Sequence, residues 1–564
     1  MCPERSTLLW GVAGVVAVLV ACGPVALLVE APTKSLRPEA ERASTGGRAG
    51  VRVTLLGVDG LRADVFEPAM KAGQLPGFSR FLGGTTSQDL SHVYFHPEAI
   101  SVFPSVTASG WSSFMTGHPP GANGVPGNEF LIRPEARFVA PVPLSVDDDG
   151  DFLASFNDRL FATLLETPTV YANLHEKGLR SWVASNHVHI GADRLLLPQR
   201  GDLLEGFGDH LLVQAGLEAE GGRYVELDEG TFGTVLEELE GADPPPDVLM
   251  VYASGVDLIS HHVPGQVVDI QRRYLIEHLD DKVGALADAL AQHGEGYRLL
   301  LSDHGHSEVP SDHRFALGRH ASEAPAFQVL RRAGFRSFGP ALGLVDENAD
   351  AAVAYQSGAA FVYLARREPC TGVRCGWREP PRYREDVLRA ADAFLHAGQE
   401  GELLHGALDA VLVREPRPFD EEDLPFSVYR GAGQTETIGA WLASRAPAGG
   451  SVHLEERLRD LATGRYGERA GDILLLAPQF VATHERYYFS SPYASTHGSA
   501  RRSDSHVPFA VAHPRHASIT LQKLVLAHTG PVARPHEVAG LVLRLATTTD
   551  GGSRNGEEAP TSRP

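Results

Sequence analysis

Cysteine, the residue that cross-links small exported domains, is scarce in this sequence. Only 4 of its 564 residues are cysteine. Two of them, Cys2 and Cys22, lie in an apolar N-terminal region, so a disulfide-dense scaffold is excluded. The other two, Cys370 and Cys375, stand close together and predict one small loop disulfide in an exported protein. Two cysteines alone favour a structural zinc site less, because such a site needs four ligands.

Basic residues are also scarce relative to acidic ones. The chain has 50 Lys and Arg against 71 Asp and Glu, which gives a formal net charge of −21. Because nonspecific nucleic-acid binding depends on Lys and Arg at the phosphates, no nucleic-acid-binding surface is expected. A small anionic substrate stays compatible with this charge, since bound metal ions invert the local field.

The N-terminus carries a long apolar run. Residues 8–20 are almost wholly apolar, and after Cys22 the run resumes to about residue 29. One interpretation of residues 1–29 is a secretory leader whose small-residue end resembles a lipoprotein box, with Cys22 lipidated. The other is an uncleaved anchor, because about 20 apolar residues span a bilayer. Both interpretations predict an extracytoplasmic, membrane-attached protein.

The length allows one large core with an insertion, and the apolar content of 43% is typical of a globular protein. Residues 30–50 are rich in Pro, Gly, Ser and Thr, which predicts a flexible tether before the core. Residues 549–564 are polar, which predicts a disordered C-terminal tail. The predicted division is a leader or anchor at 1–29, a tether at 30–50, a core at 51–314 and 471–548, a cap at 315–470 and a disordered tail at 549–564.

Carboxylate and imidazole groups follow two apolar, strand-like runs. Residues 248–252 precede Asp257 and His261, and residues 299–301 precede Asp303 and His304. A helical pattern at 266–293 lies between them, so we expect a βαβ unit and a mostly parallel α/β sheet flanked by helices. The ends of its strands would bring these side chains to one edge. Asp and neutral His are ligands of zinc and similar ions, which predicts a two-metal site.

Three further positions are candidates on weaker local signals. Asp59 ends a buried strand at 51–58, with Gly60 opening the turn. Thr107 begins a stretch of helical pattern, where a hydroxyl would lie at a positive helix end or serve as a plain N-cap. His497 precedes Gly498 shortly before another strand.

Taken together, these motifs resemble the alkaline phosphatase superfamily. The order is Val58-Asp59-Gly60, Pro104-Ser105-Val106-Thr107, Asp257…His261, Ser302-Asp303-His304-Gly305 and Thr496-His497-Gly498. The resemblance covers roughly residues 50–548 and is nearest to the type I phosphodiesterase/nucleotide pyrophosphatase branch and its bacterial relatives. It implies an alkaline-phosphatase-like α/β core with an inserted α+β cap, and an enzyme that hydrolyses phosphoric esters, with diesters as the expected substrates.

The resemblance also implies a role for each matched residue. Thr107 would be the nucleophile and would be transiently phosphorylated. The two ions, usually zinc in the family, would share seven residues. Asp59, Asp303, His304 and the Thr107 oxygen would hold one, and Asp257, His261 and His497 the other. The spacing Asp-x-x-x-His selects His261 over its neighbour His262.

The sequence departs from the family after the nucleophile and after the second histidine motif. Gly110 and Trp111 stand where the family has a hydrogen-bond donor to a non-bridging phosphate oxygen, so this donor is not identified. His306 stands in place of the family's usual Met and is one candidate for the missing donor. No Arg matches the phosphate-binding Arg of phosphomonoesterases. Alternatives therefore stay open: a phosphomonoesterase, a phosphonate or sulfate hydrolase, an envelope phospho-transferase, or a non-catalytic metal-binding descendant.

Overall fold

The protein is described by a computed structural model over eleven stretches of the chain. They are residues 50–142, 159–198, 223–312, 314–318, 324–337, 343–346, 348–367, 375–415, 425–445, 451–481 and 485–548. The predicted leader at 1–29, nearly all of the tether at 30–50 and the tail at 549–564 lie outside these residues. So does Cys370 of the predicted disulfide. Within the described stretches, no helix is both long and apolar enough to cross a membrane.

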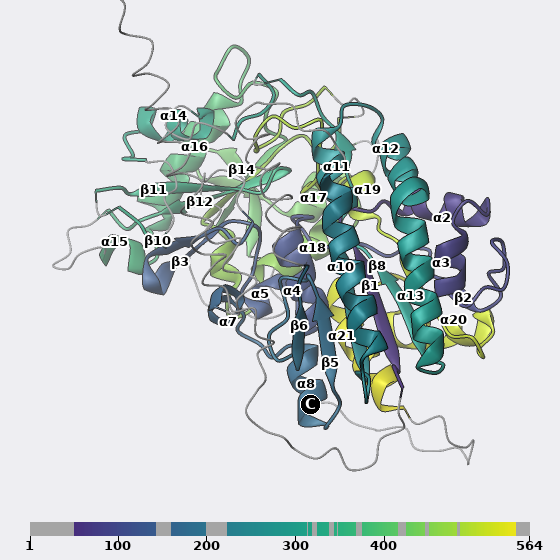
Figure 1. The fold of residues 1–564 in the computed structure, drawn as a ribbon. Helices are drawn as coiled ribbons and strands as arrows, with labels where there is room; N and C mark the ends of the chain where they lie inside the picture. The colour runs from purple at the N-terminus through teal and green to yellow at the C-terminus, as the bar shows by residue number, and fades with distance from the viewer. Residues whose placement is uncertain are drawn as a thin grey trace, which may run out of the picture.

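A seven-stranded sheet forms one half of the molecule (Figure 1). Five adjacent strands, from Tyr297–Leu301 to Arg194–Leu196 in the order given below, run parallel to one another. The strand Phe509–Ala512 runs antiparallel to both of its neighbours. The order across the sheet is β2 (Val93–Phe95), β18 (Phe509–Ala512), β8 (Tyr297–Leu301), β1 (Val53–Val58), β7 (Val248–Ala253), β5 (Ser181–Ala184) and β6 (Arg194–Leu196). The predicted mostly parallel α/β sheet is confirmed.

Strand β1 is buried on both faces because its alternate side chains enter two different cores. Leu56 and Val58 join one apolar cluster, and Val53 and Leu55 join the other. Each fully buried Val or Leu contributes about 1.5–3 kcal/mol. This explains why the strand reads as a continuous apolar run, as parallel strands between helices do.

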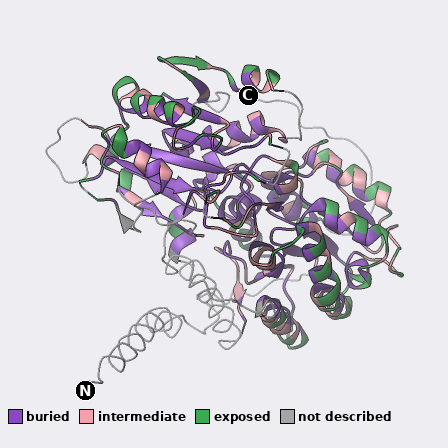
Figure 2. Ribbon diagram, turned by 90° about the horizontal axis from the view of Figure 1, so that it is seen from above, coloured by how far each residue is buried: buried purple, intermediate pink, exposed green. Residues whose placement is uncertain are grey.

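Helices cover both faces of this sheet (Figure 2). On one face lie α2 (Ala63–Lys71), α3 (Pro76–Phe81), α10 (Arg223–Glu240) and α13 (Asp280–Gln292). On the other lie α4 (Thr107–Thr116), α8 (Val170–Glu176) and α21 (Pro535–Thr547). The helix predicted at 266–293 is present as α12 (Val267–Tyr274), a π-helical turn η2 (Leu275–Leu279) and α13.

A six-stranded antiparallel sheet forms the other half (Figure 1). Its order is β11 (Ala351–Tyr355), β12 (Ala359–Leu364), β16 (Ile473–Leu476), β13 (Ala410–Arg414), β14 (Phe426–Gly431) and β15 (Gln434–Glu436). One face packs into the cluster that contains α4, and α14 (Pro325–Arg332) and α16 (Leu388–Ala397) cover the other. The second sheet and these two helices thus enclose an apolar cluster that contains no residue of the first sheet.

The second predicted core segment, which begins at residue 471, opens with β16, but this strand does not return the chain to the first sheet. It pairs with β12 and β13, in the middle of the second sheet. The chain re-enters the first sheet at β18, so position 471 is not where that sheet resumes. A short apolar strand has the same sequence pattern in either sheet.

Smaller elements complete the described chain. They are α5 (Pro120–Asn123), β3 (Phe130–Ile132), η1 (Arg133–Glu135), β4 (Arg137–Val139), α7 (Arg159–Leu164), α11 (Gly255–His262), β9 (Ser307–Glu308), β10 (Gly343–Leu344), α15 (Cys375–Arg378), η3 (Tyr383–Val387), α17 (Ile438–Ala443), α18 (Leu454–Ala462), η4 (Gly467–Ala470), β17 (Ser495–Thr496), α19 (Arg502–Ser505) and α20 (Ser518–Thr529). Of these, α11 and the pair β17–β9 contribute directly to the site described next.

Candidate metal centre

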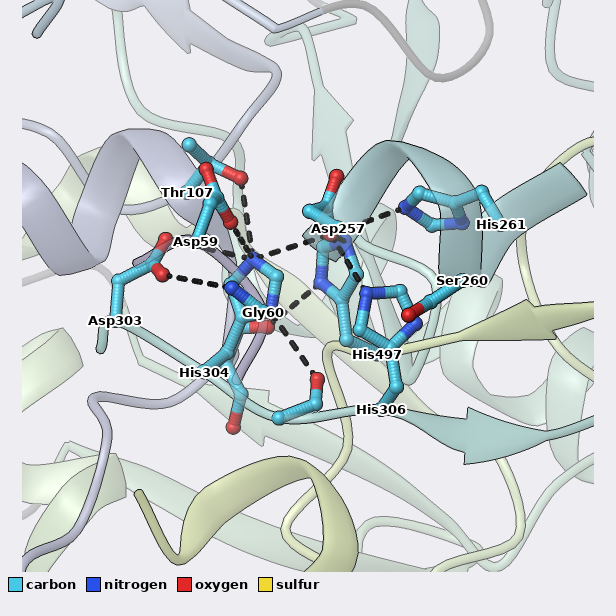
Figure 3. A network of polar contacts seen from close by, with 12 residues as sticks. Asp59, Gly60, Thr107, Asp257, Ser260, His261, Asp303, His304, His306 and His497 are labelled. Carbon is cyan, nitrogen blue, oxygen red and sulfur yellow. Dashed lines mark hydrogen bonds and ion pairs between the residues drawn. The ribbon is translucent and has the colours of Figure 1, made fainter. Parts of the chain in front are cut away.

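The structure brings all seven predicted residues together at one edge of the first sheet (Figure 3). Asp59 directly follows β1, and Asp303 and His304 follow its neighbour β8. Parallel strands end at a common edge, which is why residues about 240 positions apart in the chain meet there. The remaining ligand-type side chains enter from α11, from the start of α4 and from the segment after β17.

The first group surrounds the His304 imidazole. Its Nε2 lies 3.3 Å from Asp59 Oδ1, 3.4 Å from Asp303 Oδ2 and 3.2 Å from Thr107 Oγ1. Its Nδ1 lies 3.1 Å from the carbonyl oxygen of Gly305. A carbonyl only accepts, so Nδ1 carries the proton and Nε2 turns its lone pair toward the carboxylates.

This first group is electrostatically frustrated in the protein alone. Burial, together with the charges of Asp303 and Asp257, raises the pKa of Asp59 well above its ordinary value. Burial and the charge of Asp257 do the same to the pKa of Asp303. Burial lowers the pKa of His304 to about 3, so the imidazole is neutral at pH 7. Asp59 Oδ1 and Asp303 Oδ2 are buried and have no hydrogen-bond partner among the described residues. A divalent cation satisfies such a set of oxygens and one neutral nitrogen.

The second group converges on one oxygen of Asp257. Its Oδ1 lies 2.6 Å from His306 Nε2, 3.5 Å from His261 Nε2 and 3.8 Å from His497 Nε2. The ligand-type atoms of these four residues all lie within 4.8 Å of one another. The same holds for a set made of Asp59, Asp257 and His304, so Asp257 stands between the two groups.

Asp257 and His261 come from the short helix α11 that follows β7, whereas the sequence pattern placed them at the end of a strand. They occupy consecutive turns of α11, and a spacing of four residues puts them on one face. His262 points elsewhere and stacks on the Tyr224 ring at 5.6 Å between centroids. The choice of His261 over His262 matches this geometry.

Asp257 differs from the other two carboxyls in its charge state. Burial alone would raise its pKa, but the surrounding imidazoles of His261, His306 and His497 hold that pKa well below the ordinary value. Burial, with His304 close by, lowers the pKa of His497 well below its ordinary value. The rings of His304 and His497 stack at 3.7 Å between centroids, which couples the two groups.

Gly110 and Trp111 have packing roles that explain their presence after Thr107. A Cβ on Gly110 would come within 2.8 Å of Asp303 Cβ, so only glycine lets the first turn of α4 approach that carboxylate. The Trp111 ring packs against β1, where a Cβ on Gly57 would meet it at 2.4 Å. It also meets the Tyr252 ring edge-on, and Tyr252 donates its hydroxyl proton to Asp59 Oδ2. These two residues therefore position α4 and Asp59. The Trp111 Nε1 donor is buried and has no hydrogen-bond partner among the described residues.

Sequence reasoning missed Asn128, which lies beside the start of α4. Its Oδ1 accepts a hydrogen bond from the backbone N–H of Ala108 at 2.9 Å. That bond fixes the orientation of the amide and leaves Nδ2 as a buried donor without a partner among the described residues. No local pattern marks this loop residue, because its proximity to Thr107 arises only in the folded chain.

The two groups have the donor chemistry of a two-metal centre. Their atoms are imidazole nitrogens and carboxylate oxygens, the ligands that zinc and similar divalent ions take in proteins. Each histidine nitrogen facing away from the group is tied to a protein oxygen, as in metal sites with an ordered outer shell. The residues present thus fit two divalent ions.

Comparison with known proteins assigns the class. A model of the type I phosphodiesterase/nucleotide pyrophosphatase family matches residues 53–389. This is more than half of the 564 residues, and the chain belongs to this family of metal-dependent hydrolases in the alkaline phosphatase superfamily. No curated protein matches the sequence.

Solved structures share the fold. Human ectonucleotide pyrophosphatase/phosphodiesterase 5 is similar with a TM-score of 0.50 and 14% identity, over 90% of this chain and 97% of that one. The murine protein, solved as an inactive variant with AMP, gives 0.49 and 13% over the same shares. Phosphonoacetate hydrolase from Sinorhizobium meliloti, in complex with phosphonoformate, gives 0.45 and 16% over 89% and 97%. The human protein supports the alkaline-phosphatase-like fold of this chain.

Proposed function

We propose that this protein is an exported, zinc-dependent hydrolase of small phosphoric diesters, with Thr107 as its nucleophile. The observation that carries the proposal is the position of the Thr107 hydroxyl. Its Oγ1 lies 3.2 Å from His304 Nε2, within the first group, and at the first residue of α4. Membership of the phosphodiesterase family supports the substrate class.

The surroundings of Thr107 suit attack on phosphorus. A threonine hydroxyl is a weak nucleophile at neutral pH, and a bound divalent ion lowers its pKa and offsets the charge of the phosphoryl group. The side chain is 5% exposed, so bulk water has little access to the hydroxyl. The positive end of α4 favours an anion at the same place. In this proposal Thr107 Oγ attacks phosphorus, the alcohol leaves, and the phospho-threonine is then hydrolysed.

We assign phosphate recognition to Asn128. Its Nδ2 is a buried donor without a partner among the described residues, beside the start of α4, while its Oδ1 accepts from the Ala108 N–H. This donor is neutral, which suits a diester with one negative charge better than a monoester dianion. The nearby guanidinium groups are engaged elsewhere: Arg62 donates to the His306 carbonyl, and Arg457 donates to Ser105 Oγ. This is the physical reason for preferring diesters.

The test compares hydrolysis of bis-p-nitrophenyl phosphate and p-nitrophenyl phosphate, with added zinc and after chelation. We expect chelator-sensitive turnover that favours the diester. Thr107→Ala should lose turnover while still binding zinc, and Thr107→Ser should retain part of it as the matched control. Preference for the monoester would redirect the assignment to a phosphatase, and no turnover of either with zinc bound would redirect it to phosphonates, sulfates or a non-catalytic role.

Export and membrane attachment form a separate part of the proposal. They rest on the apolar residues 8–20 and on Cys22. Mass spectrometry of the mature N-terminus decides between the two modes. An acylated Cys22 means a lipoprotein, an intact Met1 means an anchor, and an unmodified N-terminus in the cytoplasm contradicts both.

A further inference from the structure

His306 is fully buried and belongs to the second group, with Asp257, His261 and His497. It lies two positions after His304, and its exposed fraction is 0%. Its ring occupies space that Gly60 leaves free, because a Cβ there would come within 2.9 Å of the ring atoms Cδ2 and Nε2. Gly60 also has φ +68°, a conformation that glycine adopts readily. The turn after β1 therefore accommodates an imidazole at this position.

The hydrogen bonds around His306 determine which nitrogen carries its proton. The Ser495 hydroxyl donates its one proton to the Ser260 carbonyl oxygen, at 2.5 Å. Ser495 Oγ must then accept from His306 Nδ1, 3.0 Å away. The neutral imidazole thus turns its Nε2 lone pair toward Asp257 Oδ1, only 2.6 Å away. Two lone pairs at this distance repel each other unless a cation or a proton lies between the two atoms.

The other two histidines of the group have the same arrangement. His261 Nδ1 donates to the Ser495 carbonyl at 3.0 Å, and His497 Nδ1 donates to the Ser105 carbonyl at 2.9 Å. All three imidazoles thus direct Nε2 toward a single carboxylate oxygen. A proton on His306 would satisfy one of these three lone pairs. A metal ion satisfies all three together with the carboxylate, and an outer shell of oxygen acceptors is what ligating histidines use.

We propose that His306 is a fourth protein ligand of the second metal ion, beside Asp257, His261 and His497. This inference rests on the proposed two-metal function. Three nitrogens and one oxygen would supply four protein ligands, the number that tightly held structural zinc takes. The first group has Asp59, Asp303 and His304 and needs Thr107 or substrate to complete its shell. The two ions therefore differ in affinity, and His306 sets the difference.

The experiment measures zinc binding by the purified full chain in competition with a chromophoric chelator. Wild type should bind two zinc ions with distinct affinities. His306→Met should weaken the tighter site at least about tenfold, since even outer-shell losses reach this size, and should leave the weaker site unchanged. His262→Gln is the matched control, because this neighbouring histidine stacks on Tyr224 outside the group.

A weaker site alone would also follow if His306 merely formed an ion pair with Asp257. X-ray absorption at one equivalent of zinc separates the two roles by counting imidazoles. A ligand role predicts three in wild type and two in His306→Met. An unchanged count overturns the inference, while failure of wild type to bind two zinc ions overturns the proposed function as well.

Folding of the variants is checked by thermal unfolding in excess chelator. His306→Met and wild type should then unfold at similar temperatures, and added zinc should raise the wild-type midpoint more. If His306→Met fails to fold, His306→Gln, which keeps a polar contact with Ser495 Oγ, supplies the same comparison. An equal zinc-induced shift in wild type and in the folded variant contradicts the inference.

Discussion

Replacement of Asn128 gives the sharpest test of the site, because the two ends of its amide have separate tasks. Oδ1 accepts from the Ala108 N–H, and Nδ2 is the proposed donor to phosphate. Asn128→Ala removes both ends. Asn128→Asp keeps the acceptor for Ala108 and replaces only the donor, with a negatively charged oxygen. The pair of variants therefore separates support of α4 from recognition of substrate.

The expected magnitudes follow from these contacts. Loss of one preorganised donor lowers kcat by about 10²–10³-fold. Loss of the acceptor for Ala108 destabilises the fold by about 1 kcal/mol. Asn128→Ala should show both effects. Asn128→Asp should lose at least as much activity, since its carboxylate repels an anionic substrate, while the start of α4 keeps its hydrogen bond.

The assay is kcat/KM for bis-p-nitrophenyl phosphate, measured beside the urea unfolding midpoint of each variant. If Asn128→Asp retained activity within about threefold of wild type, the amide nitrogen would not contact the phosphate and the assignment would be refuted. If both variants lost activity and stability in proportion, Asn128 would only support α4.

Two further predictions concern stability. Asp472→Ala leaves the Arg133 charge buried, because the two side chains are only 5% and 8% exposed and pair at 2.7 Å; it should lower the free energy of unfolding by about 3–5 kcal/mol in urea titrations. Lys71→Ala, which breaks the exposed pair with Glu67, should change it by only about 0.3–0.5 kcal/mol, and equal effects would contradict the burial argument. Burial raises the pKa of Asp228 to about 6, so the folded protein binds this proton more tightly and stability falls as pH rises from about 4 to 6. Asp228→Asn, measured in chelator, should remove that part of the fall, and parallel pH profiles for variant and wild type would refute the shift.

Much of the first sheet could be predicted from the sequence because its strands are buried on both faces. Continuous apolar runs such as the one in β1, alternating with helical patterns, specify a parallel sheet. Residues at the ends of those runs, Asp59 and Asp303, were predicted for the same reason. The place of β16 was not predictable, since pairing partners of a short strand depend on the whole fold.

The parts of the site that escaped prediction depend on tertiary contact. The eight residues of α11 follow a strand directly and are too few to show a clear helical period. Asn128 was not predicted, and His306 was singled out only as a candidate for contact with phosphate; both lie in irregular segments between elements. Their surroundings are supplied by Ala108 in one case and by Asp257 and Ser495 in the other. Nothing in the neighbouring sequence encodes these partners.

The position of β18 has a consequence for how the protein is made. This strand, residues Phe509–Ala512, lies between β2 and β8, which are synthesised long before it. Until it leaves the ribosome, β2 and β8 have open edges that are prone to pair with other chains. His497 and the Ser499 carbonyl that accepts from Ser105 also arrive late. A premature stop before residue 497 therefore removes both His497 and the strand that joins β2 to β8, although the other six predicted site residues are still made.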